Sequence, residues 1–417
     1  MNDSEPLARH SYGLDEVDLN LQMLLSSIGI RASSRAIEIV GVQKTGGNIR
    51  TPCWHTGRLW LMKLGLFKLS EEKEAAKDWI WIADHSIQLG TEKVLVVLGI
   101  QAKNLPEARA LDFSDMTTLG LFISKSTNGK KVAEQLRSIA NEYGEPMHIV
   151  SDGGPDLKSG IDTFINMTSG TKFIYDIKHK IAIHLKKLLG TDESWLSFCE
   201  LCTKAQSYMR QTESAALAPP NQRSKSRYMN IDRLIKWAKK IQNLDQNKVD
   251  KLFDKEKNDA CLGWLNMYKS DVESWERLVL ISELVVKHVA TYGIYSGIKE
   301  EMWLECEAMS TCKLSQQLTD LVLHDISTNE GKLKPGHRTI GSSDIIESLF
   351  GCYKNLEKQQ STSGFTSLIL AIPALVGDKS KAIVKRAMEG TKIKHVTDWV
   401  KDNLGLSVQA KRKICLG

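Results

Sequence analysis

The feature that most constrains the fold is the order in which strand and helix patterns alternate between residues 79 and 189. Short apolar runs rich in β-branched residues predict strands at 79–84, 93–100, 116–124, 147–152 and 172–176. Apolar residues at helical spacing predict helices at 129–144, 156–167 and 181–189. The order β-β-β-α-β-α-β-α predicts an α/β protein with a mixed five-stranded sheet. An antiparallel meander followed by β-α-β crossovers places helices on both faces of such a sheet.

Segments without strand patterns flank this region. From about residue 186 to 334, leucine, lysine, tryptophan and glutamate recur at helical spacing, which predicts a large all-helical insertion in the core. Further helices are predicted at 343–356, 366–375 and 380–388. Ahead of the sheet, patterns at 19–28, 33–40 and 51–66 predict three helices, a set of helix-turn-helix size. Thr51 and Pro52 offer a cap and a first-turn proline for the third.

We therefore expect consecutive segments with different roles. They are a small helical, helix-turn-helix-like domain at 1–75, the first part of the core at 76–189, the all-helical insertion at 190–336, the final helices of the core at 337–400, and a basic tail at 401–417.

Composition narrows the class of protein. With 417 residues, 42% apolar and 25% charged, the chain matches ordinary globular proteins of several domains. It has no run of about eighteen uncharged apolar residues, and it starts without a basic leader or hydrophobic export segment. We expect a soluble intracellular protein without a membrane partner, in the cytoplasm or nucleoid of a prokaryote or in the nucleus of a eukaryote.

The eight cysteines fit an intracellular location. Without an export signal, reduced thiols are expected rather than disulfides. Cys199 and Cys202 form a CxxC pair with His179 and His184 upstream. A single CxxC on an amphipathic helix lacks the second ligand pair of a zinc site, so cysteines packed in the core are the favoured interpretation.

Three acids far apart in the sequence are candidates for one site. Asp84 and Asp152 each close a predicted strand, and these two strands would be neighbours in the expected sheet. Glu347, on the helix predicted at 343–356, would supply a third carboxylate. An all-oxygen set of this kind suits two Mg²⁺ or Mn²⁺ ions. Two such ions about 3.5–4 Å apart activate the attacking oxygen and neutralise the leaving oxygen when a phosphodiester bond is cut.

Other acids compete for these roles. Asp344 and Asp325 are alternatives to Glu347. Asp112, Asp115 and Asp156 fall on loops or at the start of a helix, where solvated or capping roles are expected.

Two short patterns resemble those of known transposases. Ser342-Ser343-x-x-x-Glu347-x-Leu349-Phe350 resembles the final catalytic helix of hAT-type and related DDE transposases. Asp176-Ile-Lys-His179 resembles the [Cys/Asp]-x-x-His signature that follows the second catalytic acid in several transposase superfamilies with helical insertions. The order of strands and helices resembles the ribonuclease-H-like fold.

This resemblance implies a function. Asp84, Asp152 and Glu347 would be the catalytic metal ligands of a transposase that cuts and joins DNA. Asp176 and His179 would have a structural role beside that site. The implied partners are double-stranded DNA, as element ends and as target, and further copies of the same chain in a homodimer or larger assembly.

Basic and aromatic residues outside the sheet are candidates for DNA contacts. The net charge of +6 favours a polyanionic partner only mildly. Arg31, Ser33, Ser34 and Arg35 fall at the start of a predicted helix, where a recognition helix presents side chains to base edges. Further candidates are Arg58, Arg223, Lys225, Arg227, Lys236 and Trp303. Solvated helix faces for the basic residues, and core packing for the tryptophans of the insertion, are the alternatives.

Two other functions remain open at this point. A ribonuclease-H-like nuclease or resolvase would cut without joining strands, but would need neither the insertion nor the N-terminal helices. A domesticated DNA-binding protein would not cut at all, and would have no need of three metal-binding acids.

Overall fold

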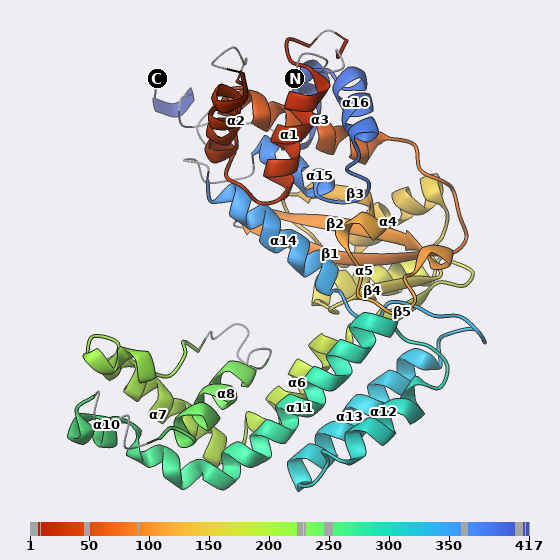
Figure 1. The fold of residues 1–417 in the computed structure, drawn as a ribbon. Helices are drawn as coiled ribbons and strands as arrows, with labels where there is room; N and C mark the ends of the chain where they lie inside the picture. The colour runs from red at the N-terminus through yellow and green to blue at the C-terminus, as the bar shows by residue number, and fades with distance from the viewer. Residues whose placement is uncertain are drawn as a thin grey trace. The chain divides into compact units, whose positions relative to one another are not determined.

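The structure, a computed structural model, describes residues 7–45 apart from residue 9, 51–89, 92–222, 228, 231–245, 253–359, 366–404, 412 and 414–416. The chain forms two compact units. One consists of Met1–Ile174 together with Ser343–Gly417, and the other of Tyr175–Ser342. The first unit contains a sheet, and the second is built of helices (Figure 1).

A mixed five-stranded sheet forms the framework of the first unit. Its strands are β1 (Trp79–Leu89), β2 (Glu92–Gln101), β3 (Thr117–Ser124), β4 (His148–Ser151) and β5 (Lys172–Tyr175). They lie in the order β3-β2-β1-β4-β5, with β2 antiparallel to both β1 and β3, and β4 parallel to β1. The prediction of a mixed sheet with an antiparallel meander is confirmed. The arrangement is consistent with a ribonuclease-H-like sheet.

Helices α4 (Gly129–Tyr143) and α5 (Pro155–Ile165) cover one face of the sheet. Trp79, Trp81 and Ala83 of β1 are buried in one apolar cluster with residues of both helices. The ring of Trp81 stacks on that of Phe164 in α5, with 5.9 Å between the centroids. Because side chains alternate along a strand, Ile80, Ile82 and Asp84 belong to the opposite face.

The opposite face is also covered. Ile80 and Ile82 are fully buried. Helix α14 (Asp344–Glu357) contacts β1, and α3 (Trp54–Ser70) contacts β3. No residue of α14 belongs to the apolar cluster that β1 forms with α4 and α5. Figure 1 shows α14 running across the sheet. The C-terminal part of the chain is thus brought to the strand that carries Asp84.

Strand β1 is longer than the sequence predicts. The predicted strand ends at Asp84, whereas β1 continues to Leu89. Its pairs with β4 end at Ile82, but its pairing with β2 continues to Leu89 with an irregularity between Ser86 and Gln88. The predicted end was wrong because the β1–β2 hairpin extends beyond the short parallel partner. Asp84 therefore lies just past the last parallel pair instead of at a strand end.

Helices from both ends of the chain complete the first unit. They are α1 (Leu14–Leu25), α2 (Ile30–Thr45), α15 (Ala371–Ala374), α16 (Lys381–Gly390) and α17 (Ile393–Leu404). Helix α3 contacts α15, α16 and α17, and every residue from Trp60 to Leu66 is buried. A helix that is buried on all sides belongs to a core.

Three details of these helices differ from the predictions. Cys53 is the N-cap of α3, so Thr51 and Pro52 precede the helix instead of starting it. The helix predicted at 366–375 is a 3₁₀ turn followed by the single turn of α15. Helix α17 was not predicted, although it is regular over twelve residues.

Two buried lysines tie α3 to the C-terminal helices. Lys63 donates to the carbonyl oxygen of Met388 in α16 at 2.6 Å. Lys68 donates to the carbonyl oxygens of Ala374 and Val376 at the end of α15. The last carbonyls of a helix lack partners inside it, and these amines supply them. Burial lowers the pKa of each lysine to about 8.

The second unit has an apolar core shared by its helices. They are α6 (Ile177–Leu189), α7 (Glu193–Met209), α8 (Ile231–Gln242), α10 (Lys255–Leu262), α11 (Lys269–Tyr292), α12 (Ile298–Glu307) and α13 (Lys313–Glu330). Trp195 and Trp275 are buried in this core with their ring centroids 4.9 Å apart. Cys199 and Cys202 are buried there too, and burial raises the pKa of the Cys202 thiol. No helix in the described ranges has the length and apolar character needed to span a membrane.

Candidate active site

The pairing of β1 with β4 brings two of the predicted acids to corresponding positions. Ile80 pairs with His148, and Ile82 pairs with Val150, in a parallel register. Extending this register by two residues brings Asp84 opposite Asp152, which directly follows β4. Neighbouring strands lie about 4.8 Å apart, and register partners face the same side of a sheet. Both acids are partly exposed, so their carboxylates are within reach of solvent.

The turn after β4 orients the carboxylate of Asp152. Gly153 has a φ of +75°, in the left-handed region that favours glycine, and the chain enters α5 at Pro155. The backbone N–H of Gly154 donates to Oδ1 of Asp152 at 2.9 Å. Oδ2 of Asp152 accepts no hydrogen bond from the described part of the chain. One oxygen therefore fixes the side chain, and the other is available to an external ligand.

The third predicted acid lies on α14, the helix that contacts β1. Glu347 is in its first turn and is partly exposed. It borders the buried stripe of Ile346, Leu349 and Phe350, which anchors the helix in the first unit. Asp344, the first residue of the same helix, is also partly exposed and stays an alternative.

A polar group that the sequence did not single out lies near these acids. Lys93 of β2 forms an ion pair with Asp156, with 2.9 Å between Nζ and Oδ2. Burial lowers the pKa of His85, and Lys93 lowers it further, while Asp156 and Asp152 oppose the shift. The sequence signals this ion pair only through Lys93, a charged residue at the start of the apolar run at 93–100. Asp156 is held in this ion pair, whereas a solvated or capping role was predicted for it.

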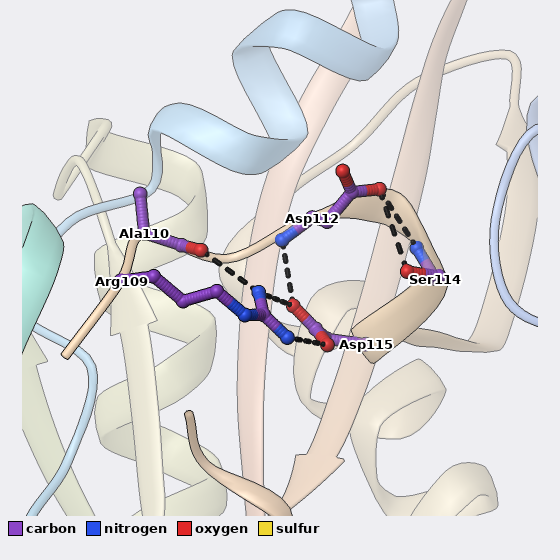
Figure 2. Close-up of polar contacts among 5 residues, drawn as sticks. All are labelled: Arg109, Ala110, Asp112, Ser114 and Asp115. Carbon is purple, nitrogen blue, oxygen red and sulfur yellow. Dashed lines mark hydrogen bonds and ion pairs between the residues drawn. The ribbon is translucent and has the colours of Figure 1, made fainter. Parts of the chain in front are cut away.

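Two rival acids form a separate structure in the connection from β2 to β3. Figure 2 shows Arg109 making two hydrogen bonds of 2.7 Å to the two carboxylate oxygens of Asp115. Asp115 also accepts from the backbone N–H of Asp112, whose own carboxylate caps the following turn at Ser114. The hydrogen bond from Arg109 lowers the pKa of Asp115. These acids therefore have the predicted capping roles.

The Asp176-x-x-His179 motif lies at the start of α6 in the second unit. Asp176 is fully buried and caps the helix by accepting from the backbone N–H of His179 at 3.0 Å. Its Oδ2 lies 3.4 Å from Nδ1 of the same histidine. These contacts give the motif a local role in starting α6.

Asp325, an alternative third acid, also belongs to the second unit. Its Oδ2 lies 2.5 Å from Nε2 of His184, and its Oδ1 lies 3.4 Å from Nζ of Lys180. Burial alone would raise the pKa of Asp325, but the contacts with His184 and Lys180 outweigh it and lower the pKa. Asp325 is thus paired within its own unit.

The start of α2 presents only half of the predicted DNA contacts. Ser33 and Ser34 are buried, and the Ser33 hydroxyl donates to the carbonyl oxygen of Ile30. These serines face the helix packing, so in this conformation they are not at the surface and the prediction of base contacts from them was wrong. Arg31 and Arg35 are exposed. Helical spacing alone could not tell which side of α2 packs inward.

The other candidates for DNA contacts are in different environments. Arg58 is partly buried and donates to Oγ of Ser367 at 3.0 Å, and burial lowers its pKa. Lys236 forms ion pairs with Glu283 and Asp232. Trp303 is 48% exposed on α12. Arg223, Lys225 and Arg227 lie outside the described residues.

The residues on the sheet fit a hard divalent cation. Carboxylate oxygens are the ligands that Mg²⁺ and Mn²⁺ prefer. Oδ2 of Asp152 and the carboxylate of Asp84 would provide such oxygen atoms from neighbouring strands.

Comparisons with known proteins give distant structural likeness but no match to a known sequence or family. No family model matches the sequence, and no curated protein matches it. Among solved structures, a Drosophila P element transposase strand transfer complex is similar at 13% sequence identity and a TM-score of 0.37. The aligned region covers 91% of this chain and 93% of that chain. What the site can do therefore follows from the residues of this chain alone.

Proposed function

We propose that the chain is a DNA transposase that cuts the ends of a mobile element and joins them to target DNA. The observation that carries the proposal is the β1–β4 register, whose extension by two residues pairs Asp84 with Asp152, on the sheet that α14, the helix of Glu347, contacts through β1. Two acids on adjacent parallel strands and a third on a packed helix suit a shared site on the sheet. The order of these elements supports the ribonuclease-H-like assignment.

The three acids would hold Mg²⁺ or Mn²⁺. Two such ions would supply activation of the attacking oxygen and neutralisation of the leaving oxygen of a phosphodiester. The chain's own contribution is to fix the ligands. The Gly154 N–H holds one oxygen of Asp152, and the pairing of Asp84 with Val96 of β2 fixes the backbone position of Asp84. Preset ligands avoid the cost of ordering them at the moment of reaction.

Double-stranded DNA is the proposed partner. The exposed Arg31 lies over the ring of Trp54, with 5.3 Å between its guanidinium carbon and the ring centroid, beside the exposed Arg35. Such a cationic and aromatic surface suits phosphate contacts. Because two element ends must be handled together, we further propose a homodimer or larger assembly in an intracellular compartment.

The test uses the full-length protein and DNA of two kinds. Labelled duplexes covering the genomic flanks of the coding region serve as element ends, and supercoiled plasmid serves as target, with Mg²⁺ or Mn²⁺. We expect metal-dependent nicking of the flanks and their joining to the plasmid, both lost in Asp152→Asn and Glu347→Gln. Asp115→Asn, an acid held by Arg109, is the control and should keep both reactions.

Each other outcome assigns a different function. Nicking without joining would indicate a nuclease or resolvase. A shifted but uncut duplex with wild type and Asp152→Asn alike would indicate a DNA-binding protein without catalysis. Either result would overturn the proposal of a transposase.

A further inference from the structure

A second set of metal-ligand side chains lies in the helical unit, among residues that the proposed function does not use. His288 of α11 and Glu301 and Glu305 of α12 bring an imidazole nitrogen and two carboxylate oxygens within 4.8 Å of one another. The two glutamates are four residues apart on one helix, so they share a face, and the histidine reaches them from the other helix.

The histidine distinguishes this set from an ordinary acidic surface. Only 7% of the His288 side chain is exposed, although it faces two exposed glutamates. Its Nε2 lies 3.8 Å from Oε1 of Glu301. Burial restricts the imidazole ring to few orientations, so a nitrogen directed at carboxylates from another helix is held in place as a metal ligand.

A tyrosine orders the same group. The Tyr295 hydroxyl donates to Oε2 of Glu301 at 2.6 Å, and Nε2 of His288 lies 2.8 Å from that hydroxyl. Tyr295 thereby holds Glu301 beside the histidine.

The charge of the group is not balanced by the protein. Among the residues that the structure describes, no lysine or arginine forms an ion pair with Glu301 or Glu305. Two carboxylates this close repel each other, and a cation between them would remove the repulsion.

We propose that His288, Glu301 and Glu305 bind one divalent cation of the Zn²⁺ type. One nitrogen and two oxygen ligands suit a borderline metal, whereas Mg²⁺ prefers oxygen alone. Bonds of about 2.1 Å in a tetrahedron place ligand atoms roughly 3.4 Å apart. The ligand atoms lie within 4.8 Å of one another, so each separation exceeds this tetrahedral value by no more than about 1.4 Å, which rotation of the exposed glutamates can close. Three protein ligands leave a fourth position for water or an external group.

The consequence is a cation that fastens α11 to α12. The two helices are joined by the short segment from Gly293 to Gly297, which contains Tyr295. A metal that binds only the folded arrangement stabilises it, and the stabilisation grows with the logarithm of the metal concentration above the dissociation constant.

The experiment measures binding of Zn²⁺ by calorimetry and of Co²⁺ by its visible absorption, on the full chain carrying Asp152→Asn. This background removes the proposed sheet site and keeps the two proposals separable. We expect one equivalent of each metal, a rise in Tm of a few degrees with Zn²⁺, and a tenfold or greater loss of affinity in Glu301→Gln/Glu305→Gln. His288→Gln should show the same loss.

Matched variants decide the result. Glu300→Gln/Glu307→Gln changes two glutamates of the same helix that are outside the set, and should bind Zn²⁺ as tightly as the parent. The Glu301 and Glu305 variants change exposed residues, so they test the proposal even if His288→Gln does not fold. Absence of a bound equivalent in the parent, or equal losses in both glutamate pairs, would overturn it.

Discussion

The backbone of Gly65 in α3 lies directly against the carbonyl oxygen of Leu370, so closely that a Cβ at position 65 would be 1.7 Å from that oxygen. Relief of this clash would require movement of α3 within the core or of the backbone at Leu370, and both movements are energetically costly. We expect Gly65→Ala to destabilise the protein by about 3 kcal/mol or more, measured by urea unfolding.

A second glycine provides the control for this substitution. Gly351 is exposed on α14, and a Cβ there would meet nothing within 4 Å. Gly351→Ala should be neutral or stabilise by about 0.5–1 kcal/mol, since alanine favours helix. Equal effects at both positions would mean that α3 does not pack against residue 370 in solution.

Lys68 predicts a specific dependence of stability on pH. Burial lowers its pKa from 10.5 to about 8 in the folded state. Below pH 8 both states carry the proton and the burial cost is present in full. Between pH 8 and 10.5 only the unfolded state keeps the Lys68 proton, so the free energy of unfolding rises with pH. From pH 7.5 to 9.5, wild type should gain about 1–2 kcal/mol relative to Lys68→Met.

The control for this prediction is an exposed lysine. The side chain of Lys204 is 69% exposed, and Lys204→Met should follow the wild-type pH profile of urea unfolding. Lys68→Met curves parallel to wild type across this range would contradict the assignment of a neutral amine bonded to the end of α15.

The sheet site predicts that its acids act as a unit. If Asp84 and Asp152 bind common cations, either Asp→Asn substitution should weaken Mn²⁺ binding at least tenfold. The double variant should then lose little more than each single one, because the site is already broken. Calorimetry with Asp115→Asn as control measures this. Small losses that simply add would show that the two carboxylates bind separately.

The Arg109–Asp115 pair predicts a small effect confined to stability. Asp115→Asn should lower Tm by no more than a few degrees at neutral pH, because the pair lies in a surface connection. The lowered pKa of Asp115 means that its contribution is present above pH 3.8 and is lost as the pH falls further. The two melting temperatures should therefore converge in acid, while metal binding at neutral pH stays unchanged.

The sheet could be predicted from the sequence because each strand contains an apolar run that is clearly separated from the next. The end of β1 could not, since residues 85–89 lack strong alternation and depend on β2 as a partner. The three site acids were chosen from their places in the predicted order of elements. The alignment of Asp84 with Asp152 comes from extending the β1–β4 register by two residues, and no local pattern specifies that register.

The sequence also did not show which residues are buried by segments distant in the chain. The serines at the start of α2 read as polar surface, and α3 read as one helix of a separate N-terminal domain. Only the tertiary contacts with α15 to α17 show that α3 is part of the core of the first unit. The His288 set was missed because its ligands combine a histidine and a glutamate pair with no recognised spacing between them.

The assembly of the first unit from both ends of the chain has a consequence for biosynthesis. Strands β1 to β4 leave the ribosome before the whole second unit, and α14 follows only afterwards. At about 5–20 residues per second, the apolar face of β1 waits roughly ten seconds or more for its covering helix. During that interval the nascent sheet is a natural client for chaperones, and messages truncated before α14 would yield an aggregation-prone product.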